Sequence, residues 1–308
     1  MKLSSENFIK AKTFINSQAR PLDQKLFKYY FENESVADVI EELENFQNGD
    51  GGFGKSIEPD FRLAISSPMA TTIGLQYARE LNLTSNHQTV QRAIRYLLES
   101  FNEKQLKWIG VPKAVNDVPR APWWNYDVAK VEGGQTPFAN PSAEIVGYLH
   151  EYSDLVPPAF LEMVTDVALN ELNQLPTAME IHDFFCYQRL LEMIPSPNKE
   201  SIYEKLILSV RDITLLDPEK WGGYGAKPLQ IASSPQSHFI SLLEKEVQLN
   251  LDYEISTLSV EGSWNPTWSW FGQYDEVWKQ AEQDWKGCLT VHNLKILNNF
   301  GRLENAHI

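Results

Sequence analysis

The fold is decided by one stretch, Gln47-Asn48-Gly49-Asp50-Gly51-Gly52-Phe53-Gly54. It follows residues 35–46, whose apolar side chains recur at the spacing of one helical face. Glycine adopts the left-handed backbone that commonly ends a helix. Shorter glycine-aromatic sequences recur at residues 221–225 (Trp-Gly-Gly-Tyr-Gly) and 262–264 (Gly-Ser-Trp). A recurring turn of this kind between helical segments indicates a repeat architecture.

A second shared feature follows two of these turns. Residues 64–68 read Ala-Ile-Ser-Ser-Pro after the first turn, and residues 231–235 read Ile-Ala-Ser-Ser-Pro after the second. Serine followed by proline is typical of a helix start. The pattern predicts a helix from Pro68 and a long helix from about Gln236. Gly133-Gly134 followed by Asn140-Pro141 is a degenerate third copy.

The rest of the chain is dominated by helical periodicity. Apolar side chains recur three and four residues apart, and almost no segment shows the alternation of a half-buried strand. We therefore expect an all-α protein of about ten or eleven helices in antiparallel pairs, forming a single domain over residues 1–308. An aromatic-rich loop at about residues 102–140 interrupts the pattern, and loops of this length are usually functional.

Composition restricts the partners and the compartment. The formal net charge of −14 argues against nucleic acid and anionic membrane surfaces as partners. Two cysteines exclude a disulfide framework and indicate a reducing interior. The N-terminal residues lack the apolar run of a signal peptide, and no segment approaches the length of a membrane span. We therefore expect a cytoplasmic protein.

The first turn resembles a known family. Residues 47–54, followed by residues 67–75 (Ser-Pro-Met-Ala-Thr-Thr-Ile-Gly-Leu), resemble the repeats of terpenoid cyclases and protein prenyltransferases. The resemblance implies an α/α toroid of helical hairpins, whose inner helices line a central cavity and whose glycine-aromatic turns lie at one rim. In that fold Phe53 would pack between hairpins and Gln47 would bond exposed backbone at a helix end.

The chemical signatures of that family are missing from this sequence. There is no Asp-x-Asp-Asp acid, no Asp-Asp-x-x-Asp magnesium motif, and the nearest match to the zinc ligands, around His182, Cys186 and His292, has the wrong spacing. We therefore predict no metal and no cofactor. The resemblance implies the fold and an apolar or isoprenoid-type ligand in an aromatic-lined cavity, and it leaves open whether the protein is an enzyme.

Two further motifs favour structural roles. Residues 49–56 (Gly-Asp-Gly-Gly-Phe-Gly-Lys-Ser) match the P-loop pattern, but a P-loop requires a strand before it and a helix directly after it. A helix precedes this stretch, so nucleotide binding is not expected. Cys288 and His292 lie one helical turn apart and could share a metal, yet two ligands do not make a site.

Three carboxylates are candidates for general acid–base work. Glu58 and Asp60 lie in the loop after the first turn, which would border the cavity mouth in a toroid. Asp127 lies in the aromatic-rich loop. The structural alternative is that all three form surface ion pairs or helix caps.

Aromatic residues in irregular segments are the main candidates for ligand binding. They do not follow a helical core stripe, so they could line an apolar cavity or serve as platforms for sugar rings. The alternative is that they pack at the rim of the fold. The candidates are Trp123, Trp124, Tyr126, Trp264, Trp268 and Trp270.

Three classes of function follow from these residues. The first is a terpenoid-cyclase- or prenyltransferase-like protein that holds a small apolar ligand. The second is a carbohydrate-active enzyme, a glycosidase or lyase, which would need two carboxylates on either side of its substrate. The third is a binding or scaffold module without catalysis. No protein partner can be predicted from the sequence.

Overall fold

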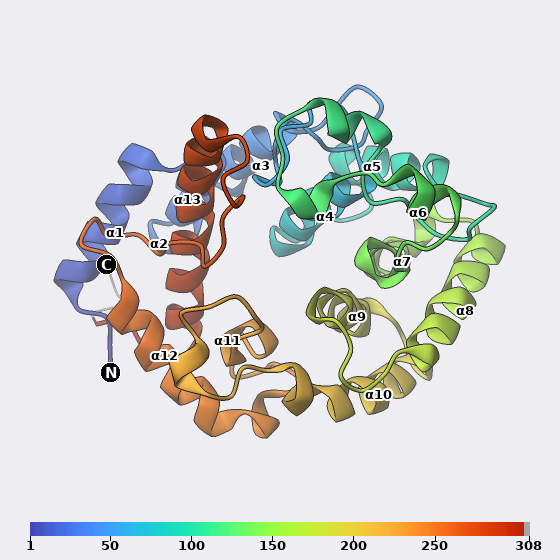
Figure 1. Ribbon diagram of the computed structural model, residues 1–308. Helices are drawn as coiled ribbons and strands as arrows, with labels where there is room; N and C mark the ends of the chain where they lie inside the picture. Colours follow the sequence, from blue (N-terminus) through green and yellow to red (C-terminus); the bar gives the residue numbers. More distant parts are fainter. Residues whose placement is uncertain (305–308) are drawn as a thin grey trace. The chain divides into compact units, whose positions relative to one another are not determined.

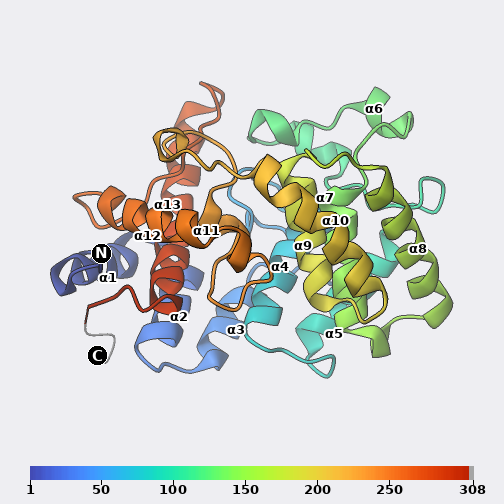
Figure 2. The same cartoon turned by 90° about the horizontal axis from the view of Figure 1, so that it is seen from below.

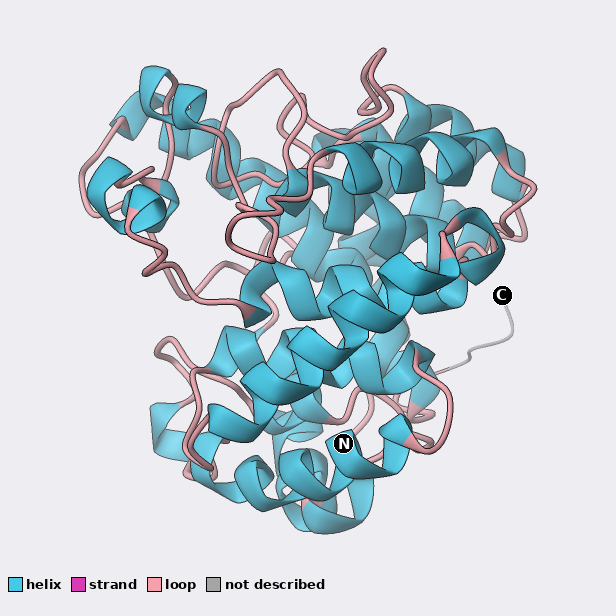
Figure 3. Cartoon of the chain, turned by 90° about the vertical axis from the view of Figure 1, so that its right-hand side faces the viewer, coloured by secondary structure: helices cyan, strands magenta, loops and turns pink. Residues whose placement is uncertain are grey.

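The computed structural model describes residues 1–304, and secondary structure in that range is helical, with isolated β-bridges but no β-strand (Figure 3). The all-α prediction is confirmed. The described residues form thirteen α-helices rather than ten or eleven. Part of the difference lies in two short helices, α6 (Val128–Glu132) and α11 (Pro228–Ile231), which are too short to produce a periodic apolar pattern.

The helices form two compact units. Residues 43–212 make up the central unit, and residues 1–42 together with the chain from Ile213 onward make up the terminal unit. The chain crosses between the units near the end of α3 (Val36–Glu44) and the end of α10 (Asn198–Ile213). A closed toroid would require a particular arrangement of the two units, and it stays a prediction.

The central unit is built around α7 (Ala139–Glu151), which lies beside α9 and also contacts α8 and α4 (Figures 1 and 2). Residues 141–149 of α7 are buried without interruption. A helix that is buried on every side belongs to the interior of its domain. The other main helices of this unit are α4 (Pro68–Glu80), α5 (Gln88–Glu99), α8 (Pro158–Gln174) and α9 (Ile181–Met193).

The terminal unit contains both ends of the described chain. Its longest helix, α13 (Asp275–Asn299), packs against α1 (Ser5–Gln18) and α2 (Pro21–Phe31), as Figure 1 shows. α12 (Glu244–Thr257) packs against the short α11. The backbone of Leu3 is paired with the last turn of the chain, since its N–H donates to Arg302 O at 2.8 Å and its carbonyl accepts from Glu304 N at 3.0 Å.

Two of the glycine-aromatic turns, at residues 47–54 and 262–264, share with a further turn at Trp108 one hydrogen bond that the sequence does not display, whereas Trp221 N–H donates to Pro218 O instead. In each of three turns the backbone N–H of an aromatic residue donates to a hydroxyl on a following helix. Because buried backbone donors need a partner, this bond fixes the turn onto that helix. The three pairs are Phe53 with Thr71 (3.0 Å), Trp108 with Ser142 (3.1 Å) and Trp264 with Thr290 (3.2 Å).

The tryptophans of these turns make a second bond through the indole. The Nε1–H of Trp108 donates to Leu97 O at 2.7 Å, and that of Trp264 donates to Glu254 O at 2.8 Å. Trp221 makes the equivalent bond to Leu215 O at 2.6 Å. Each indole N–H therefore bonds the turn to a preceding segment of the chain. Phe and Tyr have no ring N–H that could make this bond, which explains the use of Trp at these positions. These contacts support an internal repeat that includes Trp108.

The predicted helix start at Pro68 is confirmed, and the one near Gln236 is wrong. Ser67 caps α4 by accepting a hydrogen bond from Ala70 N at 3.0 Å. After Pro235, by contrast, the hydroxyl of Ser237 accepts from Ser234 N at 3.1 Å and closes a local turn. Serine side chains that bond nearby backbone in this way compete with helix formation. The next long helix, α12, begins only at Glu244.

The first turn has the structural role expected of it. The amide of Gln47 donates to the carbonyls of Gly51 and Thr89, both at 2.9 Å. The ammonium of Lys55, which would bind phosphate in a P-loop, donates to Asn45 O at 2.8 Å and Gln47 O at 3.0 Å. Gln47 therefore ties the turn to the first turn of α5 (Gln88–Glu99), and Lys55 bonds the backbone directly after α3.

Candidate functional site

Two of the candidate carboxylates, Glu58 and Asp60, are buried in the central unit, with 7 % and 3 % of their surface exposed. Glu58 Oε2 accepts a hydrogen bond from Asp60 N at 2.7 Å. The carbonyl of Asp60 accepts from Ala121 N at 2.8 Å. This loop is therefore paired with the aromatic-rich loop. The Glu58 carboxylate therefore bonds the backbone of its own loop, and both side chains are buried rather than facing solvent.

The third candidate, Asp127, is exposed and precedes α6. Its carboxylate accepts a hydrogen bond from Lys130 N at 3.1 Å. That contact is the N-cap of a five-residue helix. Its surroundings match the capping alternative.

The three aromatic candidates of the central unit differ in how far they are packed against other residues. Trp124 meets Phe61 edge-to-face with ring centroids 5.2 Å apart, so the structure brings the two candidate loops together. Trp123 is 46 % exposed. Tyr126 is held by its backbone, because its N–H donates to Asn116 Oδ1 at 2.9 Å and its carbonyl accepts from Asn116 Nδ2 at 2.8 Å.

The remaining candidates, Trp264, Trp268 and Trp270, belong to the terminal unit. Trp264 is buried and its indole N–H is used by α12, as described above. Trp270 is also buried, with 1 % of its surface exposed. Trp268 is half-buried. Of the three, Trp268 is the one whose ring reaches the surface most.

Around Trp268 and Trp270 the terminal unit gathers a larger set of rings. Trp268 meets Trp285 edge-to-face with centroids 5.1 Å apart, and it meets Tyr224 at 6.3 Å. Trp270 meets Trp278 at 5.7 Å and Tyr274 at 6.5 Å. With Phe271, which lies between these residues in the chain, they form what we call the aromatic cluster. Its members are Tyr224, Trp268, Trp270, Phe271, Tyr274, Trp278 and Trp285.

The cluster has a buried base and an exposed rim. Trp270 forms the base, whereas Phe271 is 75 % exposed and Tyr274 is 45 % exposed. Phe271 and Tyr274 both have a φ of 53°, in the left-handed region. That conformation costs a bulky residue about 1–2 kcal/mol. Strained backbone that presents two rings to the surface is a feature found at ligand sites.

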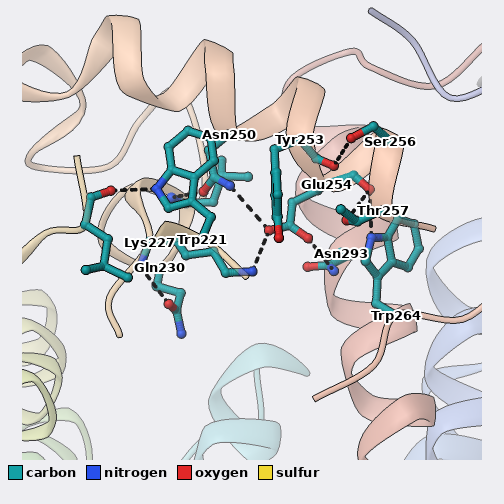
Figure 4. Close-up of polar contacts among 12 residues, drawn as sticks. Trp221, Lys227, Gln230, Asn250, Tyr253, Glu254, Ser256, Thr257, Trp264 and Asn293 are labelled. Atoms are coloured by element: carbon teal, nitrogen blue, oxygen red, sulfur yellow. Dashed lines mark hydrogen bonds and ion pairs between the residues drawn. The ribbon is translucent and has the colours of Figure 1, made fainter. Parts of the chain in front are cut away.

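Tyr224, a further exposed ring of the cluster, is 57 % exposed and lies in a loop that is anchored before and after it. Before it, the indole of Trp221 bonds Leu215 O and its ring meets Tyr253 on α12 edge-to-face at 5.4 Å. After it, the ammonium of Lys227 lies 5.2 Å from the centroid of the same Tyr253 ring. Both anchors therefore hold the loop to one turn of α12 (Figure 4).

A buried carboxylate completes this anchor. Glu254 Oε1 lies 3.0 Å from Lys227 Nζ and 3.3 Å from Asn250 Nδ2, and Oε2 lies 3.5 Å from Asn293 Nδ2 (Figure 4). Asn250 in turn accepts from Leu229 N at 3.1 Å. These bonds connect α11, α12 and α13 beneath the loop that carries Tyr224, and a charge buried in this way requires such partners.

The charge near the cluster is acidic. The first turn of α13, directly after Tyr274, contains Asp275 and Glu276. Glu276 is paired with Lys279 at 2.8 Å, but both side chains are largely exposed, so solvent screens the pair. Two carboxylates therefore follow Tyr274 directly, one of them paired with Lys279.

The described residues contain no group of three or more His, Cys, Asp or Glu side chains arranged to hold a metal ion. Cys288 instead contacts Arg20 and donates to Asp23 Oδ1 at 3.5 Å. Burial raises the pKa of its thiol well above the ordinary value. Within residues 1–304, no helix combines the length and the apolar character needed to cross a membrane.

Sequence reasoning missed five members of the cluster, although one of them, Tyr224, lies in the glycine-aromatic turn at residues 221–225. Trp278 and Trp285 lie seven residues apart on α13, and that spacing places them on one helical face. This periodicity was the available signal. For Phe271 and Tyr274 the signal in the sequence is weaker. It consists of the neighbouring glycine, Gly272, which in the structure has a left-handed φ of 79°.

Comparisons with known proteins identify no relative. No protein-family model matches the chain, and no curated protein or solved structure matches it either. The function must therefore be argued from the site.

Proposed function

We propose that the protein binds a neutral, largely apolar small molecule at the aromatic cluster of the terminal unit. The observation that carries this proposal is Phe271, whose ring is 75 % exposed although its backbone is held at a φ of 53°. A phenyl ring that is 75 % exposed gains little from burial within the fold, and the left-handed backbone costs stability. Ligand binding accounts for both features.

The chemistry of the rim favours an apolar ligand over a sugar. The side chain of Phe271 is 75 % exposed. It has no polar atom that could form a hydrogen bond with a hydroxyl group of a sugar. The rings of Trp268 and Trp285 meet at an interplanar angle of 81°, so they form a contoured surface rather than parallel platforms. Burying one such side chain against a ligand contributes about 1.5–3 kcal/mol.

The ligand class that fits best is an uncharged isoprenoid. This class agrees with the resemblance of residues 47–54 to the repeats of terpenoid cyclases and prenyltransferases, which remains an expectation. The acidic turn after Tyr274 would repel a diphosphate, so we propose the alcohol or hydrocarbon form rather than the diphosphate. No catalytic step is part of this proposal.

The test is tryptophan fluorescence with three probes: farnesol, farnesyl diphosphate and a linear glucan oligosaccharide. Farnesol should quench saturably and bind more tightly than the diphosphate. The double variant Phe271→Ala/Tyr274→Ala should weaken farnesol binding by roughly tenfold or more, from the apolar area lost. Leu249→Ala, at a 42 % exposed apolar residue of α12, is the matched control and should bind normally.

Two outcomes would reject the proposal. One is farnesol binding that is unchanged in the double variant, since the ligand would then lie elsewhere. The other is saturable binding of the oligosaccharide with no response to farnesol, which would favour the carbohydrate alternative.

A further inference from the structure

Residues 127–136 of the central unit form an exposed segment with little apolar anchorage. The segment contains α6 and the Gly133-Gly134 turn that follows it, and Figure 2 shows α6 at the periphery of the unit. Within residues 127–136, all of which the structure describes, Val131 is the one buried residue and Thr136 is half-buried. Burial of apolar side chains therefore contributes little to holding this segment in place.

Two side chains from an earlier loop hold this segment by its carbonyl groups. The amide of Gln105 donates to Val131 O at 2.7 Å. The ammonium of Lys107 donates to Gly134 O at 3.2 Å and to Thr136 O at 2.5 Å. Carbonyl groups at the end of a helix lack partners within the helix, and a cation is favourable there. The two side chains therefore fasten both α6 and the turn after it.

The closed segment covers a cation whose direct partners are carbonyl groups. Lys107 is only 6 % exposed, and within residues 1–304 its ammonium bonds carbonyl oxygens rather than a carboxylate. Burial lowers the pKa of Lys107, whereas the charge of Glu171 on α8 acts in the opposite direction. By contrast, the buried Lys227 pairs directly with Glu254. Lys107 is thus buried without the ion pair that usually accompanies a buried charge.

The closed segment also leaves two side-chain oxygens unsatisfied. Gln105 Oε1 and Thr136 Oγ1 are buried, and neither has a hydrogen-bond partner among residues 1–304. A polar atom that is buried without a hydrogen bond costs stability. Opening of the segment would return both atoms to water. The free energy regained in this way offsets part of the cost of breaking the bonds made by Gln105 and Lys107.

We propose that residues 127–136 form a lid that opens as one unit and, when closed, masks the ammonium of Lys107. Both ends of the lid are held. Asn116 bonds the N–H and the carbonyl of Tyr126 at 2.9 and 2.8 Å, and Phe138 is 8 % exposed. The movement therefore stays local. The open lid presents a cation at the surface of a protein whose net charge is −14, and it does so whether or not the aromatic cluster binds a ligand.

The experiment measures how fast the N-hydroxysuccinimide ester of acetic acid acetylates Lys107 in the folded protein, as read by mass spectrometry of its peptides. Lys104 is exposed and serves as the internal reference. Lys107 should react at least about tenfold more slowly than Lys104, a ratio that corresponds to 1.4 kcal/mol. Low concentrations of urea should leave the rate at Lys107 unchanged, because a local opening exposes little additional surface.

Three variants of lid residues test the closed state. Val131→Ala removes buried apolar contacts and should speed the acetylation of Lys107 about fivefold. Thr136→Val keeps the shape of the side chain but removes the unsatisfied hydroxyl, so it should slow the acetylation about threefold. Gln135→Ala changes an exposed lid residue and should leave the rate unchanged.

Lys107→Met tests the fastening of the lid directly. Methionine occupies a similar volume but cannot donate to the carbonyls of the lid. Trypsin should therefore cleave after Lys130, an exposed lid residue, at least about tenfold faster than in the unmodified protein. Lys104→Met is the matched control, since it removes an exposed charge from the same loop and should leave this cleavage unchanged.

The proposal is overturned if Lys107 and Lys104 react at equal rates in the unmodified protein, or if Lys107→Met is cleaved no faster than Lys104→Met. It is also overturned if Val131→Ala and Thr136→Val change the acetylation rate in the same direction. A rate at Lys107 that rises with urea in parallel with global unfolding would reject the lid as well, because exposure would then require unfolding of the whole unit. The comparison of Lys107 with Lys104 needs no variant, so it decides even if a variant fails to fold.

Discussion

The ammonium of Lys227 lies 3.0 Å from Glu254 Oε1 and, at the same time, 5.2 Å from the centroid of the Tyr253 ring. The Lys227 and Glu254 side chains are only 17 % and 9 % exposed. One cation thus compensates a buried carboxylate and faces an aromatic ring on the adjacent residue of α12. The segment that precedes Lys227 carries Tyr224, so this contact links the buried network to the rim of the aromatic cluster.

Lys227→Met should destabilise the terminal unit by about 2 kcal/mol, because it leaves Glu254 without its cation. The double variant Lys227→Met/Glu254→Gln should recover part of this loss. Urea unfolding of the single and double variants measures the coupling. The exposed pair of Lys279 and Glu276 gives the control, and Lys279→Met should cost little stability because solvent screens that pair. If Lys227→Met and Lys279→Met lowered the free energy of unfolding equally, burial of the Lys227–Glu254 pair would not make it more important for stability than the exposed pair.

Phe271→Gly should separate stability from binding. Glycine adopts a φ of 53° without strain, which gains about 1–2 kcal/mol, and the added flexibility of the unfolded chain offsets about 0.5–1 kcal/mol of this. The melting temperature should therefore stay the same or rise while farnesol binding weakens. Phe271→Ala keeps the strained backbone and loses the ring, so it should lose binding without the gain. A clear fall in melting temperature for Phe271→Gly would mean that the ring supports the fold.

The hydroxyl groups that receive the turn N–H bonds should be essential for stability. Thr290→Val keeps the shape of the side chain but leaves the buried Trp264 N–H without its acceptor. Such a group costs about 1–3 kcal/mol. Thr290→Ser retains the hydroxyl and should lose less. Thermal unfolding of both variants measures this difference. If Thr290→Val were as stable as Thr290→Ser, the hydrogen bond from Trp264 N–H would not contribute to stability.

Asp183 should make stability depend on pH. Burial and the nearby charge of Glu180 raise its pKa from 3.8 to about 6 on folding, so the folded state holds a proton that the unfolded chain has released between these values. The stabilising contribution is present below pH 3.8 and is lost as the pH rises through 6. Because solvent screens part of this effect, the charged form costs about 1–2 kcal/mol at pH 7.5 and less at pH 4.5.

Asp183→Asn should therefore stabilise the protein more at pH 7.5 than at pH 4.5, as measured by urea unfolding at both values. Asp166→Asn is exposed and should change stability equally little at both. A gain for Asp183→Asn that does not vary with pH would contradict the assignment of the raised pKa to this carboxyl group.

Local sequence signals predicted the helices well and one helix start poorly. Ser67 and Ser234 both precede proline, yet only Ser67 caps a long helix. The difference lies in Ser237, whose hydroxyl bonds Ser234 N and closes a turn. A pattern of caps and prolines does not reveal which of two local hydrogen bonds will form.

Contacts between distant segments limited prediction of the site. Glu58 and Asp60 were expected at an open loop, but pairing of their loop with Ala121, some sixty residues later, accompanies their burial. Trp268 and Trp270 were predicted to bind a ligand, but the sequence did not show that they pack beside Trp285 and Trp278 of α13. Their role in binding a ligand stays a prediction.

The pairing of Leu3 with the chain near Leu303 has a consequence for synthesis on the ribosome. The central unit is one continuous segment, so it can fold as soon as residue 212 has emerged. The terminal unit must wait, because α1 and α2 pack on α13, which is made after the whole central unit. Until then the first forty residues remain without their partner, and their apolar side chains depend on the cell's chaperones or on transient contacts for protection.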